Sequence, residues 1–505
     1  MTAKFIAAVF SGLLLAAAFP RWDQAYLLPV ALVPLFLALR GLSPGAAFWV
    51  GLVHGLAAFG GILYWIAYVT NVFGGLPLPA AVGVMLLLAG YLALYRGLWS
   101  LGVAWGEKRG LGLLWFAPVL WVALEYLQTY MLSGFPWELL GYGVYRHPML
   151  LQVADLTGVY GLSFLIVLVN VAVCHLVFPP RGKGGGRLQP ALLLLLVAAL
   201  WLGYGYFRLG AVQKLAAQAP KIKVAVVQGN IKQGEKWKKE LVEATIKRYA
   251  DLTAKAGGAR LVIWPETAAP FFYSHTPDLA AQVQDIVRKN HSFLLFGALA
   301  MDKKPEGDIF YNRAYLLSPQ GETLGRYDKA HLVPFGEYVP LKRILFFVNK
   351  MVPMIGDFGE GPVGATVPLP EAKVGPLICF ESIFAYLSRA QVEGGARLLV
   401  NITNDAWFGT TSAPYQHLAM GVLRAVEGRV SLARAANTGF SAFVDPAGRL
   451  LWRSGLFEPD SRVEELPLMP GGSLYTRYGD VFAWACVILA ALALVFKRRR
   501  FRERD

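Results

Sequence analysis

The chain has 505 residues, of which 56% are hydrophobic, and it carries a formal net charge of +15. That apolar share exceeds the roughly 45–50% of ordinary globular domains, which excludes a wholly soluble protein. The basic excess is not typical of a nucleic-acid-binding protein, because much of it lies in short loops between apolar blocks and in the tail KRRRFRERD at 497–505. The composition therefore predicts a membrane protein that carries one large soluble domain.

Apolar blocks fill most of residues 1–210 and return once near the end of the chain. A transmembrane helix needs about 17–25 apolar residues, and on this measure we predict an eight-helix transmembrane bundle, with helices 1–7 in residues 1–210. No small-residue cleavage site follows the first block, which makes a cleaved signal peptide the weaker interpretation. The predicted spans are 5–20, 25–40, 46–71, 78–105, 112–131, 151–178, 189–208 and 479–496.

Basic residues mark alternate loops between these spans. Lys4 precedes the first span, Arg40 ends the second, GEKRG at 106–110 follows the fourth and RGKGGGR at 181–187 follows the sixth, whereas the loop at 70–79 has neither Lys nor Arg. By the positive-inside rule, both termini and the basic tail are then cytoplasmic. The soluble domain follows the seventh span, so we expect it on the outer side of the membrane, which is the periplasm in a cell with two membranes.

Residues 221–470 alternate between β-like and helical patterns. Such alternation predicts an α/β layered fold with helices outside the sheet, in which active groups lie at strand ends. The expected strands include 221–230, 259–267, 292–300, 373–383 and 396–408, and the expected amphipathic helices are 238–256, 277–290 and 415–437.

Three predicted strand or hairpin ends carry reactive residues: Glu266 in LVIWPE, Lys329 in GRYDK and Cys379 in PLIC. Singly, each has an ordinary interpretation as a helix cap, a solvated cation or a small buried hydrophobe. Together they supply what acyl transfer needs. A nearby cation lowers the pKa of a thiol and stabilises an oxyanion, and a carboxylate whose pKa is raised by burial takes the thiol proton.

The motifs around these residues have a recognisable order. WPE, YDKAHLVPFGEYVP, ICFE and then NDAWFG at 404–409 resemble the carbon-nitrogen hydrolase (nitrilase) superfamily and its Glu-Lys-Cys triad. The resemblance implies an αββα sandwich over 221–470. It also implies that Glu266 is the base, Lys329 the electrostatic stabiliser and Cys379 the nucleophile.

Over essentially its whole length the sequence is similar to the apolipoprotein N-acyltransferase family of bacterial envelopes. The resemblance implies transfer of an acyl chain from a phospholipid, preferably phosphatidylethanolamine, to the α-amino group of a lipoprotein's diacylglyceryl-cysteine. It implies a multi-pass monomer of the bacterial inner membrane with a periplasmic catalytic domain and no cofactor. The segments that carry the similarity are VVQGNIKQGEKW at 226–237, WPET, YNRA at 311–314, HLVPFGEYVP at 331–340 and TNDAWFG.

Five further residues are candidates for supporting or substrate-binding roles. Glu337 would position Lys329 or a substrate amine, or form a loop salt bridge, and Glu381 would bond Lys329 or cap the following helix. Trp237 and Asn312 match family motifs without a role that their chemistry reveals. Phe380 stands where many family members carry Tyr, so any role of that hydroxyl is lost. The seven His residues form no HxH or HxxxH pair, and we predict no metal.

The expected mechanism is ping-pong through a thioacyl-Cys379 intermediate. We expect the apolar segment 340–361 to act as a lid, with Phe346, Phe347, Met351 and Met354 on the bilayer or an acyl chain. In the outer loop 133–148 we expect Trp137 and Tyr142 to anchor the chain at the membrane interface.

Two alternatives stay open. A membrane-tethered amidase would use the same triad to hydrolyse its substrate instead of transferring an acyl group. A transporter or receptor with an inactive binding domain would need more charges within the spans than this sequence has. Glu125, near the outer end of the fifth predicted span, is the exception, and we expect it to face the soluble domain and a lipid headgroup.

Overall fold

The computed structural model describes residues 1–179, 187–305, 307–338 and 358–496, in two compact units. The helical unit combines residues 1–209, 411–423 and the chain from 478 onward, and the α/β unit comprises 210–410 and 424–477. Residues 411–423 lie within the predicted soluble domain, but their contacts group them with the helices.

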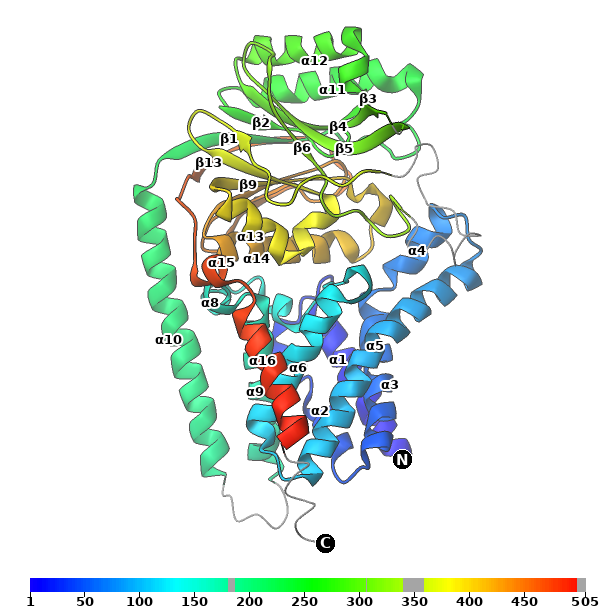
Figure 1. The fold of residues 1–505 in the computed structure, drawn as a ribbon, viewed down its shortest axis with the longest axis vertical. Helices are drawn as coiled ribbons and strands as arrows, with labels where there is room; N and C mark the ends of the chain where they lie inside the picture. Colours follow the sequence, from blue (N-terminus) through cyan, green and yellow to red (C-terminus); the bar gives the residue numbers. More distant parts are fainter. Residues whose placement is uncertain (180–186, 306, 339–357, 497–505) are drawn as a thin grey trace. The chain divides into compact units, whose positions relative to one another are not determined.

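The helical unit contains helices of very different lengths (Figure 1). Within the described ranges, four helices are long and apolar enough to cross a membrane, namely α3, α5, α9 and α10, while α1 and α16 are apolar but shorter. The longer helices are α1 (Thr2–Ala18), α3 (Pro44–Ile62), α5 (Leu78–Lys108), α6 (Leu113–Tyr130), α9 (Val159–Val177), α10 (Leu188–Gln218) and α16 (Val481–Phe496). The short ones are η1 (Ala25–Leu27), α2 (Val33–Leu39), α4 (Trp65–Val72), η2 (Met131–Ser133), η3 (Leu140–Val144), α7 (Pro148–Leu151) and α8 (Ala154–Thr157), and α15 (Leu474–Tyr478) joins the two units.

The predicted count of eight spanning helices is not confirmed. The segment predicted as the second span is the turn η1 followed by α2, whose 7 residues are too few to cross a bilayer. Pro29 lies within this break, and a proline lacks the N–H that a helix interior requires. The predicted span 151–178 also divides, since Gly158 between α8 and α9 has a φ of +63°.

Small residues let the helices of this unit pack closely. A Cβ atom added to Gly55 of α3 would lie 2.7 Å from the Cα atom of Ala93 in α5, and one added to Gly51 would overlap the Ser100 hydroxyl. Close backbone approach through small residues is the usual way in which helices associate without a hydrophobic driving force.

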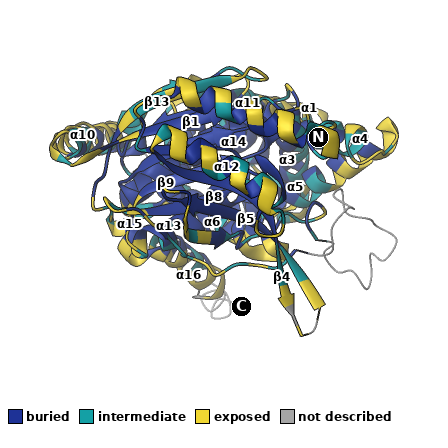
Figure 2. Cartoon of the chain, turned by 90° about the horizontal axis from the view of Figure 1, so that it is seen from above, coloured by how far each residue is buried: buried dark blue, intermediate teal, exposed yellow. Residues whose placement is uncertain are grey.

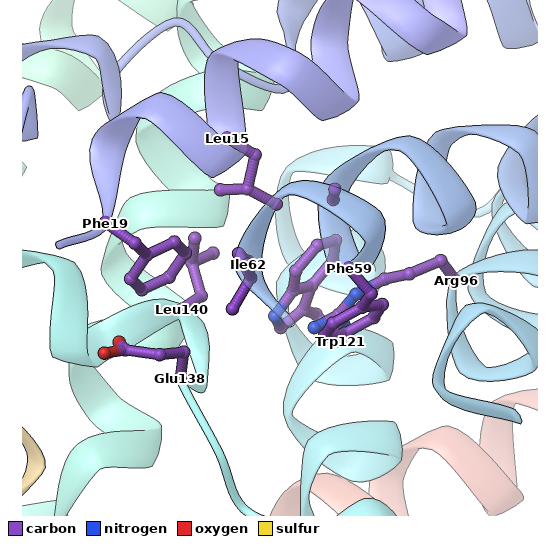
Figure 3. A pocket seen from close by; sticks show the side chains of 9 residues that line it. Leu15, Phe19, Phe59, Ile62, Arg96, Trp121, Glu138 and Leu140 are labelled. Atoms are coloured by element: carbon purple, nitrogen blue, oxygen red, sulfur yellow. The ribbon is translucent and has the colours of Figure 1, made fainter. Parts of the chain in front are cut away.

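Glu125 does not face a lipid headgroup, and that expectation is wrong. Its carboxylate is buried, lies 3.7 Å from the Arg96 guanidinium and accepts hydrogen bonds from the Trp121 indole and the Leu140 N–H, at 2.8 and 2.9 Å. It therefore ties α6 to the outer loop. A small pocket beside this pair is lined by Leu15, Phe19, Ala58, Phe59, Ile62, Arg96, Trp121, Glu138 and Leu140 (Figure 3).

Trp137 and Tyr142 are both buried, so the expectation that they anchor the membrane interface is also wrong. The Trp137 indole donates a 2.8 Å hydrogen bond to the Gln416 side chain, which also accepts from Trp65 and donates to the Ile62 and Pro20 carbonyls. Gln416 belongs to segment 411–423, and its four hydrogen bonds explain why that segment is grouped with the helices.

The α/β unit contains two sheets, as the resemblance to an αββα sandwich implied. The first has the strand order β13-β1-β2-β4-β5-β6, with β3 paired to β4, and the second has the order β12-β11-β10-β9-β8-β7. Neighbours β1, β2 and β4 run parallel, as do β8, β9 and β10. The strands are β1 (Lys221–Gln228), β2 (Leu261–Ile263), β3 (Ala269–Phe272), β4 (Phe293–Lys304), β5 (Gly307–Leu317), β6 (Thr323–Asp328), β7 (Val367–Pro368), β8 (Lys373–Ile378), β9 (Ala396–Thr403), β10 (Ser431–Ala436), β11 (Ala442–Val444), β12 (Leu450–Arg453) and β13 (Asp460–Pro467).

The two sheets face each other across a dry core. Val226 and Leu295 of the first sheet pack with Ile378 and Val400 of the second, and burial of each such side chain contributes about 1.5–3 kcal/mol. Figures 1 and 2 show the buried strands between the helices α11 (Val242–Lys255) and α12 (Pro277–Asn290) on one side and α13 (Ala385–Glu393) on the other. This is the expected αββα order of layers.

Helix α11 shows why this order forms. Its buried residues Val242, Ile246, Tyr249 and Leu252 recur every three or four positions, so they share one face, and that face packs on the first sheet. The remaining described helices are η4 (Lys239–Leu241), η5 (Tyr273–His275), η6 (Cys379–Ile383), η7 (Asp405–Phe408) and α14 (Ala413–Gly428).

Candidate active site

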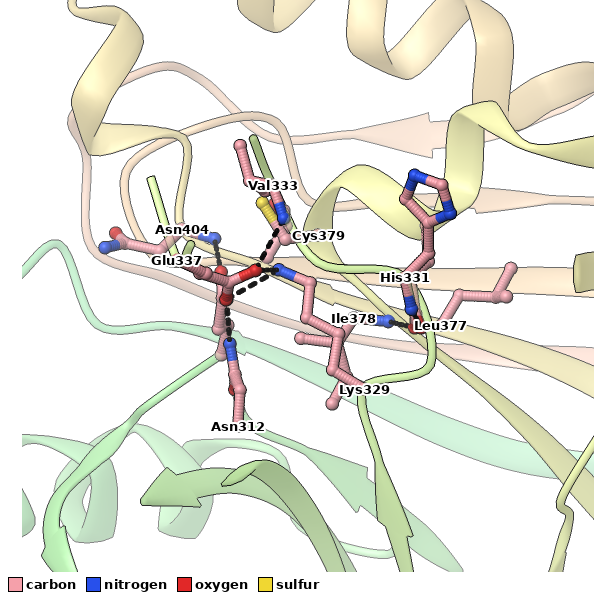
Figure 4. Close-up of polar contacts among 12 residues, drawn as sticks. Asn312, Lys329, His331, Val333, Glu337, Leu377, Ile378, Cys379 and Asn404 are labelled. Atoms are coloured by element: carbon pink, nitrogen blue, oxygen red, sulfur yellow. Dashed lines mark hydrogen bonds and ion pairs between the residues drawn. The ribbon is translucent and has the colours of Figure 1, made fainter. Parts of the chain in front are cut away.

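Glu266, Lys329 and Cys379 come together at the strand ends of the α/β unit. Figure 4 shows Lys329 and Cys379 with their neighbours. Glu266 lies just beyond β2, Lys329 directly follows β6 and Cys379 directly follows β8, so the two sheets supply different members of the group. The Lys329 Nζ atom lies 3.8 Å from Glu266 Oε1, and the charges of both residues act on the Cys379 thiol. The geometry thus agrees with the predicted triad.

Cys379 is held on a strained turn. Its φ of +54° lies in the left-handed region, which non-glycine residues seldom adopt, at the point where β8 becomes the 3-10 helix η6. The Asn401 amide fixes this turn by donating to the carbonyls of Leu377 and Cys379, at 3.0 and 3.4 Å. Strained backbone that is over-determined in this way is concentrated at functional sites.

The Cys379 thiol is not a preformed thiolate. Burial raises its pKa to about 12, with the Glu266 carboxylate adding to the rise, while Lys329 and a hydrogen bond with Thr403 oppose it. Lys329 therefore lowers the pKa of the thiol, as expected, but burial and Glu266 raise it by more. The resting thiol is protonated near neutral pH and needs a base to become a nucleophile.

The Glu266 carboxylate is oriented by two hydrogen bonds. Its Oε1 atom accepts from the Asn312 amide at 2.7 Å, and its Oε2 atom accepts from the Asn404 N–H at 3.0 Å. Gly297 in β4 makes room for the turn, because a Cβ atom there would lie 2.8 Å from the Glu266 Cα atom. The Oε1 atom also lies 3.8 Å from the Lys329 ammonium, and the charge of the carboxylate acts on the Cys379 thiol, as expected of a base.

Lys329 is buried and paired with Glu337. Its ammonium lies 3.0 Å from both Glu337 oxygens, and Val333 N–H holds Glu337 at 2.9 Å. Burial alone would lower the pKa of Lys329, but the carboxylates of Glu337 and Glu266 raise it above its ordinary value. Of the interpretations open for Glu337, the contacts favour positioning of Lys329, which stays positively charged.

Asn312 links the two carboxylates of the site. The same Nδ2 atom that donates to Glu266 also lies 3.1 Å from Glu337 Oε1, and the residue is almost fully buried. Asn312 thus fixes the position of Glu266, the predicted base, relative to Glu337, the partner of Lys329.

Glu381 caps its own turn and, among the described residues, makes no hydrogen bond to Lys329. Its carboxylate accepts from the N–H groups of Ile378 and Ala330, each at 2.6 Å, from His331 N–H at 3.1 Å and from the Tyr327 hydroxyl at 3.0 Å. Burial raises its pKa to about 7, against these donors. Glu381 therefore fastens the end of β8 to the chain that follows Lys329.

The two aromatic candidates, Phe380 and Trp237, pack against apolar and aromatic side chains. The Phe380 ring packs on Phe384 and His331, with ring centroids 5.1 and 6.0 Å apart. Trp237 packs on an apolar cluster, which we call the Trp237 cluster. It consists of Trp237, Phe272, Leu299, Phe310, Leu332, Tyr338 and Phe358.

Sequence reasoning passed over Lys236, Thr403 and Asn404, which contact the triad residues. Lys236 lies in the motif VVQGNIKQGEKW, and Thr403 and Asn404 lie in TNDAWFG. Their place in these motifs was the available signal, but only the fold shows which motif residues point into the site. The predicted lid residues lie in 339–357, outside the described residues. In the described part of the chain, no group of three or more His, Cys, Asp or Glu side chains could hold a metal ion.

Two family models match the chain, an apolipoprotein N-acyltransferase N-terminal domain over residues 11–172 and a carbon-nitrogen hydrolase over 223–468. The chain is 46% identical to an apolipoprotein N-acyltransferase from Geobacter metallireducens, covering 98% of this chain and 96% of that protein. It is 34% identical to one from Methylococcus capsulatus, with the same two coverages. An amidase from Nesterenkonia sp. AN1 is 21% identical over 52% of this chain and 98% of its own, with a TM-score of 0.38.

Proposed function

The chain belongs to the apolipoprotein N-acyltransferase family, and we propose that it moves a fatty acyl chain from a phospholipid, phosphatidylethanolamine by preference, to the α-amino group of a lipoprotein's N-terminal diacylglyceryl-cysteine. It is an N-acyltransferase that acts in lipoprotein maturation. The observation that carries the mechanism is the partly buried thiol of Cys379, on which the charges of the Glu266–Lys329 pair act; the charged atoms of that pair are 3.8 Å apart.

The first half-reaction forms a thioester. Glu266 takes the proton from Cys379 as the sulfur attacks the ester carbonyl of the phospholipid, and the Lys329 ammonium stabilises the oxyanion that develops. The carbon–oxygen bond then breaks, and the proton on Glu266 passes to the departing glycerol oxygen. A lysophospholipid leaves, and the acyl chain stays on the sulfur.

The second half-reaction forms the amide. The lipoprotein's neutral amine attacks the thioester carbonyl, and Glu266 takes the proton that the nitrogen loses. When the carbon–sulfur bond breaks, that proton returns to sulfur and the thiol is restored. One carboxylate thus serves both halves, which fits its fixed position between Asn312 and Asn404.

The surroundings of the site favour transfer over hydrolysis. Leu299 of the Trp237 cluster pairs across the sheet with Asn312, so an apolar surface begins one side chain away from the base. We propose that this surface holds the acyl chain, since burial of each CH₂ group contributes about 0.8 kcal/mol, and that it keeps water from the thioester.

We also propose a multi-pass arrangement in the bacterial inner membrane. The alternation of basic loops supports cytoplasmic termini and a periplasmic α/β unit. Both lipid substrates would then lie in the same bilayer as the enzyme. In this proposal the protein acts as a monomer.

The test is intact-protein mass spectrometry of the purified protein mixed with phosphatidylethanolamine, beside a Cys379→Ala control. We expect a fatty-acyl mass gain that hydroxylamine removes, that the control lacks and that a diacylated lipopeptide discharges. A folded protein that forms no adduct but hydrolyses small amides would instead be an amidase.

A further inference from the structure

Lys236 is a second buried lysine at the site. It lies in the loop between β1 and α11, is only 3% exposed, and its Nζ atom donates a 3.0 Å hydrogen bond to the main-chain carbonyl of Glu266. This is its one hydrogen bond within the described ranges, although an ammonium has three donors. A lysine is almost never fully buried without a reason, since burial of its charge is costly.

The groups around Lys236 leave a charge to be balanced. Glu266 and Glu337 bring two negative charges to one hydrogen-bonded network, and Lys329 brings a single positive charge. When the Cys379 proton moves to Glu266, one negative charge only shifts from oxygen to sulfur. Asp405 also acts on the thiol, but it is paired with Arg434 at 2.7 Å. Glu381 is a further carboxyl group that acts on Lys329. Lys236 places a second cation beside the Glu266 carboxylate.

We propose that Lys236 is a positioning residue of the acyl-transfer reaction, which holds Glu266 through its main-chain carbonyl and supplies the second positive charge that favours the Cys379 thiolate. The inference rests on the proposed function for its place in the reaction. A purely structural role would require only the hydrogen bond and would be indifferent to the charge.

The charge of Lys236 also gives a pH dependence. Burial lowers its pKa to about 8, although the Glu266 carboxylate and Cys379 oppose that fall. As the pH rises through 8, Lys236 becomes neutral and support for the thiolate is lost. Acylation should therefore decline above pH 8, well below the pH at which Lys329 loses its proton.

The experiment compares Lys236→Met, Lys236→Arg and a control, Lys238→Met, whose side chain is exposed on the same loop. Two rates are followed from pH 6 to 10: alkylation of Cys379 by iodoacetamide, read by peptide mapping without lipid, and thioester formation from phosphatidylethanolamine. An opposite charge typically shifts a pKa by about 1–3 units, so in Lys236→Met both rates should fall about 10- to 1,000-fold at pH 7. Lys236→Arg should keep most of the rate and lose the decline above pH 8, while Lys238→Met should match the wild type.

Wild-type rates and an unchanged pH profile in folded Lys236→Met would overturn the inference. If that variant does not fold, an unchanged decline above pH 8 in Lys236→Arg overturns it equally. The alkylation arm separates this inference from the proposed function. Slower alkylation in Lys236→Met, beside a wild type that takes no acyl group from phospholipid, would uphold the role of Lys236 and reject the acyl donor.

Discussion

Asn312→Ala tests whether the site depends on the amide that joins its two carboxylates. The substitution removes hydrogen bonds of 2.7 Å to Glu266 and 3.1 Å to Glu337. A hydrogen bond to a charged group contributes about 1.5–3 kcal/mol, so the two together set a range of about 3–6 kcal/mol. Each carboxylate keeps one backbone N–H and its attraction to Lys329. We therefore expect the lower end, a loss of about 3 kcal/mol in the free energy of unfolding.

The same change should slow thioester formation about 10- to 100-fold, because Glu266 loses the side-chain contact that orients it, and each tenfold corresponds to about 1.4 kcal/mol. The assays are denaturant unfolding in detergent and time-resolved intact mass spectrometry. Asn312→Asp, which replaces the donor with a third carboxylate, should be worse than Ala. Asn290→Ala in α12, which loses one hydrogen bond to the Ile286 carbonyl, should cost no more than about 1 kcal/mol and leave acylation unchanged. Acylation by a stable Asn312→Ala within threefold of the wild type would refute the reasoning.

Three further predictions follow from the contacts. Glu266→Gln removes a negative charge that raises the pKa of Cys379, so alkylation of the thiol should become faster at pH 7–9 while acyl transfer is lost; slower alkylation would contradict this assignment of charges. Glu337→Gln should lower the pKa of Lys329 by removing the carboxylate 3.0 Å away, and acylation should fall about 100-fold with a new decline at high pH; a profile like that of the wild type would show that Glu337 is dispensable. Gln416→Ala removes four hydrogen bonds within the helical unit and should cost about 2–4 kcal/mol on thermal unfolding, whereas a change below 0.5 kcal/mol, roughly the scale of an ordinary surface substitution, would mean that segment 411–423 is not held there by its side chain.

Hydropathy located the helical unit and most of its long helices, but not the breaks within the predicted spans 25–40 and 151–178. The apolar windows merged η1 with α2 and α8 with α9, because a window average does not register the backbone break at Gly158 or the turn that contains Pro29. Trp137 and Tyr142 were expected at the membrane interface on residue type alone. Trp137 donates a hydrogen bond to Gln416, 279 residues later in the chain, and no local pattern contains that contact.

The sequence predicted the α/β character of the second unit, and the resemblance of its motifs implied two β layers and the three candidate catalytic residues. The α/β character is a local feature, because the spacing of apolar residues sets strands and helices. The tertiary structure assigned each strand to one of the two sheets. It also decided that Asn312 joins two carboxylates, that Glu381 caps its own turn, and that Lys236 reaches the Glu266 carbonyl. The raised pKa of Cys379 also depends on the tertiary structure. Burial and the charges of residues distant in the sequence set this pKa, and the fold alone brings those residues to the thiol.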